Sequence, residues 1–359
     1  MFRCSAISAL LLACLLLPPP ARAGDLLERS NPRTIRVRAD SSARTKLQSK
    51  AGELRSIIAV MTVPVNNEYQ EAKPVARVSD SSLMAFPETG DKYLSYRKRI
   101  RPSKGNDILE IFYEYDVTMY DVAVDFKKID YTYPWKETIP LYARYTRTVK
   151  PYIMPQDSRI FKMSRAIIVD NKLRENEHLL FARCAYKYIV DNFRLTKKDV
   201  KYINGMAGLE KTLDWRRGDS GALANVFISL LRCRKIPARH LIGIKPDGTP
   251  HIMADFYLQG YGWIPVDIAG QMTFRERDFF GRLYAKLSPV ILAHDLELTA
   301  SPPEINRRTM TFIHAYSHWL TLTSGRFVDP DMVETFRFGL SGAPNEEAVK
   351  AGQDQYLLK

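Results

Sequence analysis

The hydrophobic periodicity of this chain changes once, between about residues 148 and 160, and that change limits the folds open to it. Before it, apolar and polar residues alternate, most strictly over residues 109–119, which is the pattern of a half-buried β-strand. After it, apolar residues recur at helical spacing, most clearly over residues 176–193. The change predicts an α+β protein in which an antiparallel β-sandwich precedes a region of helices and strands.

The alternation slips by one residue inside the β-rich region. Val117 and Met119 share one parity, whereas Val122 and Val124 have the other. Because a one-residue slip turns side chains to the opposite face of a sheet, we expect a β-bulge or a new strand near Tyr120. Residues 24–50 are polar and basic without a clear period, so they predict an N-terminal arm or a first edge strand.

The first 23 residues have the composition of a secretory signal peptide. A short basic start precedes an apolar run over residues 6–17, and Ala21-Arg22-Ala23 supplies the small residues that signal peptidase requires. The apolar run is too short to span a bilayer, and no second run of membrane length follows. We therefore expect an exported protein, periplasmic or extracellular, without a transmembrane segment. A lipoprotein acylated at Cys14 is the alternative.

Composition and motifs argue against several classes of ligand. The 53 Lys and Arg residues give a net charge of +13, but they are scattered among 40 acidic residues, which favours a solvated cationic surface over a nucleic-acid site. His314 and His318 stand four residues apart without the glutamate of a zinc motif or a third ligand, so we expect no metal site. No dinucleotide or phosphate-binding glycine loop occurs, and we expect no cofactor.

Two cysteines would remain after removal of the signal peptide, Cys184 and Cys233. One disulfide between them is the alternative in an exported protein, but both lie in segments with helical periodicity. We therefore predict that they are buried free thiols.

Residues 213–269 contain the candidate site. Gly218-Asp219-Ser220-Gly221 opens a predicted helix, and the strand patterns that follow cover residues 240–244, 251–258 and 263–269. This order places Ser220 at a helix N-terminus, His251 on one strand and Asp267 on the next strand. The positive field of a helix N-terminus favours an anionic nucleophile, a histidine can take its proton, and an acid can hold the imidazole ring.

This segment resembles the transglutaminase-like superfamily, whose core is papain-like. The resemblance rests on ordered anchors, which are Gly218, Ser220, Leu230-Leu231-Arg232, Ile236-Pro237-Ala238-Arg239, Gly243, His251, Gly262-Trp263 and Asp267. It implies a papain-like core over residues 151–300, preceded by the β-sandwich domain at 24–150 and followed by a C-terminal extension at 301–359.

The resemblance also implies acyl chemistry on a peptide, protein or cell-wall amide, with His251 as the base and Asp267 orienting it. No cofactor takes part in such chemistry. Trp215, Asp219 and Trp263 are candidate substrate contacts, although tryptophans in such segments are more often part of the core.

The chain departs from the family at the nucleophile, because the family cysteine falls on Ser220. Cys233 lies 13 residues further on and cannot replace it. A hydroxyl is far less acidic than a thiol, so we expect weak or no activity. Ser220 is open to three interpretations: a natural pseudoenzyme, a serine hydrolase built on the same triad, or an engineered inactive form. A non-catalytic peptide- or glycan-binding protein, using the same cleft or the β-sandwich, is the alternative from another class.

Overall fold

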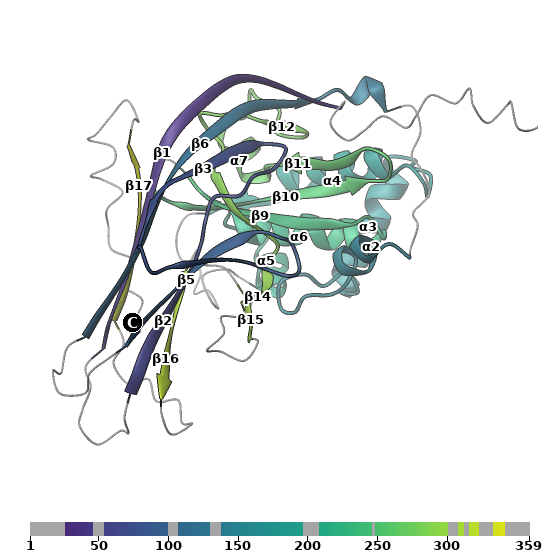
Figure 1. Cartoon of the computed structure of the whole chain (residues 1–359). Helices are drawn as coiled ribbons and strands as arrows, with labels where there is room; N and C mark the ends of the chain where they lie inside the picture. The colour runs from purple at the N-terminus through teal and green to yellow at the C-terminus, as the bar shows by residue number, and fades with distance from the viewer. Residues whose placement is uncertain are drawn as a thin grey trace, which may run out of the picture.

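The chain forms two β-sheets at one side and a layer of helices on a third sheet at the other (Figure 1). The computed structural model describes residues 26–45, 54–99, 107–129, 138–196, 208–245, 248–300, 308–311, 316–322 and 333–341. The predicted signal peptide and His314 lie outside these residues. In the described part of the chain, no helix has both the length and the apolar character needed to cross a membrane.

The β-rich part is a sandwich of two antiparallel sheets, as the alternation predicts. One sheet has the strand order β12-β6-β1-β17 with β3 beside β6, and the other has the order β16-β2-β5-β4. Their bounds are β1 Leu27–Thr45, β2 Leu54–Thr62, β3 Gln70–Arg77, β4 Ser82–Ala85, β5 Lys92–Arg99, β6 Asp107–Val124, β12 Arg282–Leu283, β16 Tyr316–Leu322 and β17 Val333–Ser341. Val37, Met61 and Tyr113 are fully buried in the core that both sheets share.

The N-terminal segment is not an arm or an edge strand. Strand β1 lies between β6 and β17, because the C-terminal strand pairs with it from Arg36 to Arg44. The slip in alternation does correspond to a bulge, but the bulge lies in β1, between Ser30 and Arg33. Strand β6, where it was expected, continues without a break. The extra residues of β1, where Asn31 adopts φ 49°, let β6 change the parity of its buried residues without ending.

A four-stranded antiparallel sheet with the order β11-β10-β9-β13 forms the centre of the second part. Its strands are β9 Ala238–Ile244, β10 Pro250–Leu258, β11 Gly262–Val266 and β13 Val290–His294, and the helices around it are α2 Pro140–Tyr145, α3 Ser158–Asp170, α4 His178–Asn192, α5 Leu209–Trp215, α6 Ser220–Cys233 and α7 Ile268–Thr273. Short elements complete the fold: η4 Phe126–Lys128, β7 Arg194–Leu195, β8 Arg217–Gly218, β14 Glu297–Ala300 and β15 Arg308–Thr311.

Helix α6 is the buried axis of this part. Its residues from Gly221 to Arg232 are all buried, since it packs against β9 and β10 on one side and against other helices around it. A helix that is buried on every side belongs inside a core rather than on its surface. The two cysteines pack at the edge of this core as free thiols, as predicted, but they are half-buried rather than buried.

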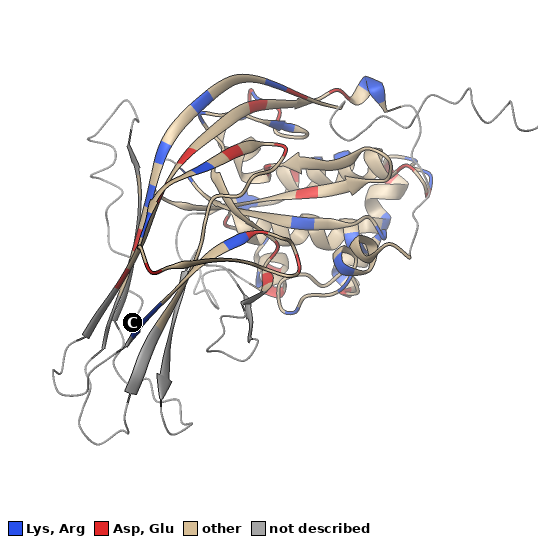
Figure 2. Cartoon of the chain, in the orientation of Figure 1, with Lys and Arg blue, Asp and Glu red and all other residues tan. Residues whose placement is uncertain are grey.

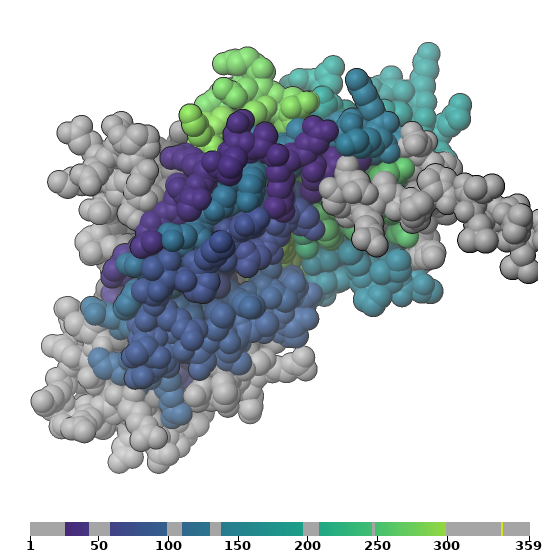
Figure 3. Space-filling view, turned by 45° about the horizontal axis from the view of Figure 1, so that its top comes forward, coloured from purple at the N-terminus to yellow at the C-terminus, as the bar shows by residue number. Residues whose placement is uncertain are grey.

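The face of the central sheet that points away from α6 packs on the sandwich. Leu241, Met253 and Ile291 of the central sheet share an apolar cluster with Tyr69 and Val122 of the sandwich. In the space-filling view, green residues of the later segment lie directly against the purple strand β1 (Figure 3). The sandwich and the central sheet therefore share a packed boundary.

Candidate active site

Asp219 and Ser220 begin helix α6 in different roles. Asp219 is the N-cap, and its Oδ1 accepts a hydrogen bond from the N–H of Ala222 at 2.8 Å. Gly218 precedes the cap, and a Cβ there would lie 2.5 Å from the Cβ of Ala222, so the approach of the chain to the helix requires glycine. Because Asp219 satisfies the helix end, the hydroxyl of Ser220 is available for other contacts.

The hydroxyl of Ser220 lies at the edge of strand β10. Strand β11 ends at Val266, which pairs with Ala254, so the N–H of Ile252 projects beyond the last residue of β11. That N–H donates to Ser220 Oγ at 3.2 Å. Ser220 therefore stands next to the backbone of His251 and is half-buried. Within the described residues, no hydrogen bond joins Ser220 Oγ to the His251 ring.

His251 and Asp267 form a buried pair beside it. The Nε2 atom of His251 lies 2.9 Å from Oδ2 of Asp267, and the two residues are 4% and 2% exposed. Since a carboxylate only accepts, Nε2 carries the proton in this contact, and Nδ1 is the nitrogen that remains to act as a base. The structure thus brings together all three of the residues that the sequence selected, from the start of helix α6, from strand β10 and from the cap of helix α7.

Asp267 is held by the start of helix α7. The predicted strand 263–269 ends early, at Val266, because Asp267 caps α7 and its Oδ1 accepts the N–H of Gly270 at 2.8 Å. Burial alone would raise the pKa of Asp267, but His251 and the Gly270 N–H outweigh it, and the pKa is lowered. A Cβ on Gly270 would lie 2.6 Å from Asp267 Oδ2, so glycine is required for this contact.

The pKa of Asp219 shifts in the opposite direction to that of Asp267. The carboxyl group of Asp219 is largely buried, and this desolvation raises its pKa, although backbone N–H groups of α6 and the nearby His251 act against the increase. The site therefore contains two carboxyl groups with opposite shifts, one orienting the histidine and the other capping the helix.

The two candidate tryptophans lie in different surroundings. Trp215 ends α5 and is 45% exposed, three residues before the Gly218 turn. Trp263 is a half-buried residue of β11 whose ring lies beneath Arg239, with the guanidinium carbon 3.8 Å from the ring centroid. Trp263 therefore packs within a buried polar layer, whereas Trp215 presents its ring to solvent.

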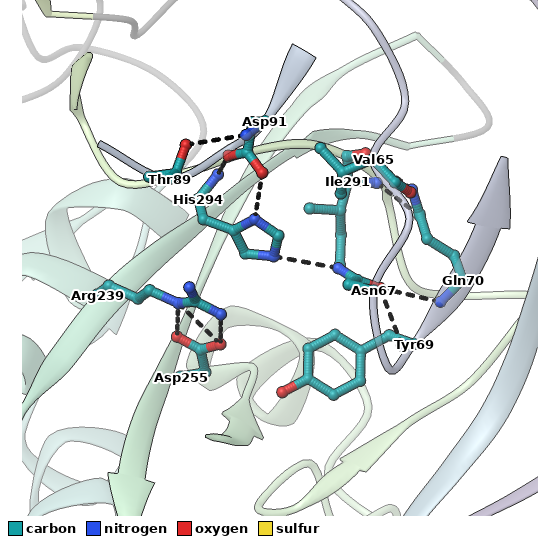
Figure 4. A network of polar contacts seen from close by, with 10 residues as sticks. All are labelled: Val65, Asn67, Tyr69, Gln70, Thr89, Asp91, Arg239, Asp255, Ile291 and His294. Carbon is teal, nitrogen blue, oxygen red and sulfur yellow. Dashed lines mark hydrogen bonds and ion pairs between the residues drawn. The ribbon is translucent and has the colours of Figure 1, made fainter. Parts of the chain in front are cut away.

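That polar layer was not predicted. Arg239 of β9 and Asp255 of β10 form a bidentate pair with distances of 3.0 Å, and Figure 4 shows this pair close to Tyr69 and His294. A charged residue in the middle of an apolar strand is the signal that could have found them, because buried charges are almost always paired.

A second group in Figure 4 ties the sandwich to the central sheet. Asp91 Oδ1 lies 2.7 Å from Nδ1 of His294, and Asp91 Oδ2 accepts the His294 backbone N–H at 2.6 Å. Asn67 Nδ2 lies 3.2 Å from Nε2 of the same histidine. Asn67 and Asp91 come from the sandwich and His294 from β13, so the network crosses the boundary between the two parts.

Charges elsewhere on the molecule are mixed. Figure 2 shows blue and red positions interspersed along the strands of the sandwich and among the helices. Arg36 pairs with Asp116, and Arg38 with Asp40 and Glu114, on the exposed face of β1 and β6. Among the described residues, no group of three or more potential ligands is arranged to hold a metal ion.

Comparison with known proteins gives a family and a fold. Residues 169–268 match the model of the transglutaminase-like superfamily. A crystal structure from Cytophaga hutchinsonii, provisionally assigned as a cysteine protease, matches with a TM-score of 0.53 and 13% identity, over 88% of this chain and 100% of that chain. The periplasmic domain of TgpA from Pseudomonas aeruginosa matches with a TM-score of 0.34 and 15% identity, over 63% of this chain and 74% of that domain. A search of curated proteins gives no match.

These findings confirm the predicted fold class, an α+β core preceded by a β-rich region. The matched range contains Ser220, His251 and Asp267, from the start of α6 to the cap of α7. Residues 169–268 of this chain are therefore a transglutaminase-like domain.

Proposed function

We propose that this is an exported transglutaminase-like protein of amide acyl-transfer ancestry, weakly active or inactive with Ser220 at the nucleophile position. The observation that carries the proposal is the 2.9 Å hydrogen bond between His251 and Asp267 beside the N-terminus of α6. A histidine held by a buried acid next to a helix-borne nucleophile is the arrangement that acyl transfer uses.

In this scheme the Ser220 Oγ attacks the carbonyl carbon of an amide in a peptide, a protein or cell-wall material, while His251 Nδ1 takes the hydroxyl proton. The backbone N–H of Ser220 helps to bind the oxyanion. The intermediate collapses when the leaving nitrogen takes the proton from His251, which leaves an acyl ester on Ser220. Water or an amine then attacks the ester, and His251 carries the proton as before. Asp267 stays ionised and fixes the ring.

Two observations support low activity. Oxygen is a weaker nucleophile than the thiolate on which the family relies, because a hydroxyl keeps its proton at neutral pH. In addition, Ser220 Oγ accepts the Ile252 N–H and makes no hydrogen bond to the His251 ring within the described residues. The hydroxyl thus accepts a hydrogen bond from the backbone and does not donate its proton to the base.

The test is the S220C variant, which restores the family nucleophile. We expect its introduced thiol to be alkylated by iodoacetamide at pH 6 at least tenfold faster than Cys184 and Cys233, because burial raises the pKa of both native thiols. In the chain without residues 1–23, which removes Cys4 and Cys14, peptide mapping by mass spectrometry separates the three sites. The S220C/H251A variant is the matched control, and it should lose the enhanced rate together with any amide turnover.

The alternative is a non-catalytic peptide- or glycan-binding protein that uses the cleft or the sandwich. It is favoured if the thiol in folded S220C reacts no faster than the native thiols and the variant releases no ammonia or amine from a broad peptide panel. Amide turnover by S220C that disappears in S220C/H251A supports the catalytic ancestry instead.

A further inference from the structure

A short parallel ladder leads into the nucleophile position. Strand β8 pairs with β7 so that Arg217 stands beside Arg194 and Gly218 beside Leu195. The backbone holds this ladder through Arg194 N–H to the Arg216 carbonyl and Thr196 N–H to the Gly218 carbonyl, both at 2.9 Å. Gly218 is the last residue before the cap of α6, so the ladder ends directly at the candidate site.

The ladder places two like charges side by side. Neighbouring strands lie about 4.8 Å apart, and residues in register project on the same face. Arg194 and Arg217 are both exposed, and neither makes an ion pair within the described part of the chain. Like charges directly opposite each other on a sheet are destabilising. The contact between these two arginines therefore does not stabilise the fold.

Some exposed arginines of the described residues pair with carboxylates. Arg159 contacts Asp214 at 2.6 Å, and Arg183 contacts Asp278 at 2.8 Å. Arg194 and Arg217 differ from these in standing side by side on the surface before Ser220, where no carboxylate of the described residues pairs with either. Such a pair is complementary to an anionic group that arrives with a ligand.

An exposed aromatic ring adjoins the pair. The guanidinium carbon of Arg217 lies 5.5 Å from the centre of the Trp215 ring, and that ring is 45% exposed. Arg216 between them adopts φ 47°, which turns the chain from α5 into β8. A solvent-facing tryptophan next to arginines is a common composition for the centre of a recognition surface, because it offers a large apolar face without loss of many rotamers.

Sequence distance sets how far this surface lies from the reacting bond. Arg217 precedes Ser220 by three residues, and an extended chain spans about 3.5 Å per residue, so the two Cα atoms are within roughly 11 Å. An extended peptide bound at Ser220 would bring a side chain to the arginines within about three residues of the reacting carbonyl. The field of the α6 N-terminus also favours negative charge there.

We propose that Arg194, Arg217 and Trp215 form a recognition subsite for an acidic peptide, with a carboxylate side chain within about three residues of the amide that faces Ser220. This inference rests on the proposed function for its position beside the reacting amide. It adds the substrate class, which neither the family match nor the His251–Asp267 pair supplies.

The test measures binding, so it does not depend on turnover. Two fluorescently labelled eight-residue peptides that contain a central glutamine are compared by anisotropy, one with glutamates on both sides and one with glutamines in their place. At low salt we expect the acidic peptide to bind the chain at least tenfold more tightly. The R194Q/R217Q variant should lose that preference. R77Q/R282Q removes two exposed charges from the sandwich and should keep it.

Thermal unfolding provides a second readout that does not need a ligand. Because the paired charges repel, R217Q should melt at the same temperature as the parent chain or higher, which also shows that the variant folds. Equal or undetectable binding of the two peptides overturns the subsite, and so does a preference that R194Q/R217Q retains. If S220C is inert but the acidic preference holds and needs both arginines, the proposed catalysis fails while the subsite stands.

Discussion

At the scale of single residues, one carboxylate decides what His251 can do. Asp267 Oδ2 accepts the Nε2 proton and its Oδ1 accepts the Gly270 N–H, so both oxygens are engaged and the carboxylate cannot turn. The ring of His251 is therefore fixed with Nδ1 as its basic nitrogen. Removal of the charge at Asp267 would leave the ring in place but change which nitrogen carries the proton.

This gives the first prediction, made in the S220C background. D267N keeps the size of the side chain but offers an NH₂ group to Nε2, which favours the wrong tautomer. We expect kcat/KM for amide release to fall by about 10³ to 10⁴, mostly in kcat, as for other triads that lose their acid. D278N, which removes the exposed partner of Arg183, should leave the rate unchanged. Full activity in D267N would show that His251 does not depend on this carboxylate.

At the scale of elements, the start of α6 assigns the capping role and the candidate nucleophile role to two different residues. From the local sequence, Ser220 beside Asp219 is typical of a helix cap, and only the later His251 and Asp267 favour a nucleophile. In the structure Asp219 supplies the cap, at 2.8 Å to the Ala222 N–H, and the hydroxyl of Ser220 contacts β10 instead. Capping thus fixes the position of Ser220 without using its side chain.

The second prediction compares two substitutions of the cap. D219A removes the capping oxygen and should lower the free energy of unfolding by about 1 kcal/mol at pH 7. D219N keeps a capping oxygen and carries no charge. Because burial raises the pKa of Asp219, ionisation of this residue opposes folding as the pH rises, so D219N should be neutral or stabilising at pH 7. Urea unfolding measures both, and an equal loss in the two variants would contradict the burial argument.

The third prediction concerns the first turn of α7. A methyl group on Gly270 would lie 2.6 Å from Asp267 Oδ2 and 2.9 Å from the Phe279 ring, so the carboxylate or the helix must shift. We expect G270A to destabilise the chain by about 1 to 3 kcal/mol, the usual range for overpacking, and to slow S220C catalysis. G339A is the control, because nothing lies within 4 Å of a Cβ at that glycine. Wild-type behaviour of G270A would show that the turn tolerates movement.

Local pattern predicted the elements well where one face of each is buried. Alternation gave the sandwich, helical spacing gave α4, and the ordered anchors gave α6, β9 and β10. Position within a sheet was not predictable for β1, because its partner β17 comes about 300 residues later and no local signal identifies it. Asp255 was not identified as the partner of Arg239 for the same reason, since the pairing becomes visible only when β9 and β10 are in register.

At the scale of the whole molecule, strands from the late part of the chain pair with strands from its early part. Strand β17 pairs with β1 and β16 pairs with β2, so residues from the predicted C-terminal extension complete the sheets of the N-terminal sandwich. Strand β12 of the later segment also pairs with β6. The sandwich is therefore assembled from both ends of the chain, and its boundary with the central sheet is crossed by the network of Asp91, His294 and Asn67.

The fourth prediction tests that network through its acid. Asp91 is 6% exposed; burial opposes its charge, but its hydrogen bonds with His294 prevail and lower its pKa. A carboxylate with a lowered folded-state pKa contributes stability above its unfolded value of about 3.9, and the contribution is lost as the pH falls through the folded value. D91N should therefore lower the free energy of unfolding by about 2 kcal/mol at pH 7, the usual size for a buried charge-assisted hydrogen bond. The difference from the parent chain should shrink below about pH 4.

The place where D91N loses stability shows whether Asp91 stabilises the boundary between the sandwich and the central sheet or the fold in general. Hydrogen exchange at pH 7 should accelerate in D91N over residues 63–70 and 290–294, because Asp91 holds the His294 backbone N–H and His294 in turn holds Asn67. D116N removes an aspartate from the exposed ion pair with Arg36, where solvent screens the charge, and should change exchange little in either segment. If D91N loosens only strand β5, which Asp91 directly precedes, the network is a local contact. The sandwich is then held to the central sheet by the apolar cluster of Tyr69, Met253 and Ile291 and by the hydrogen bonds between Gln70 and Ile291.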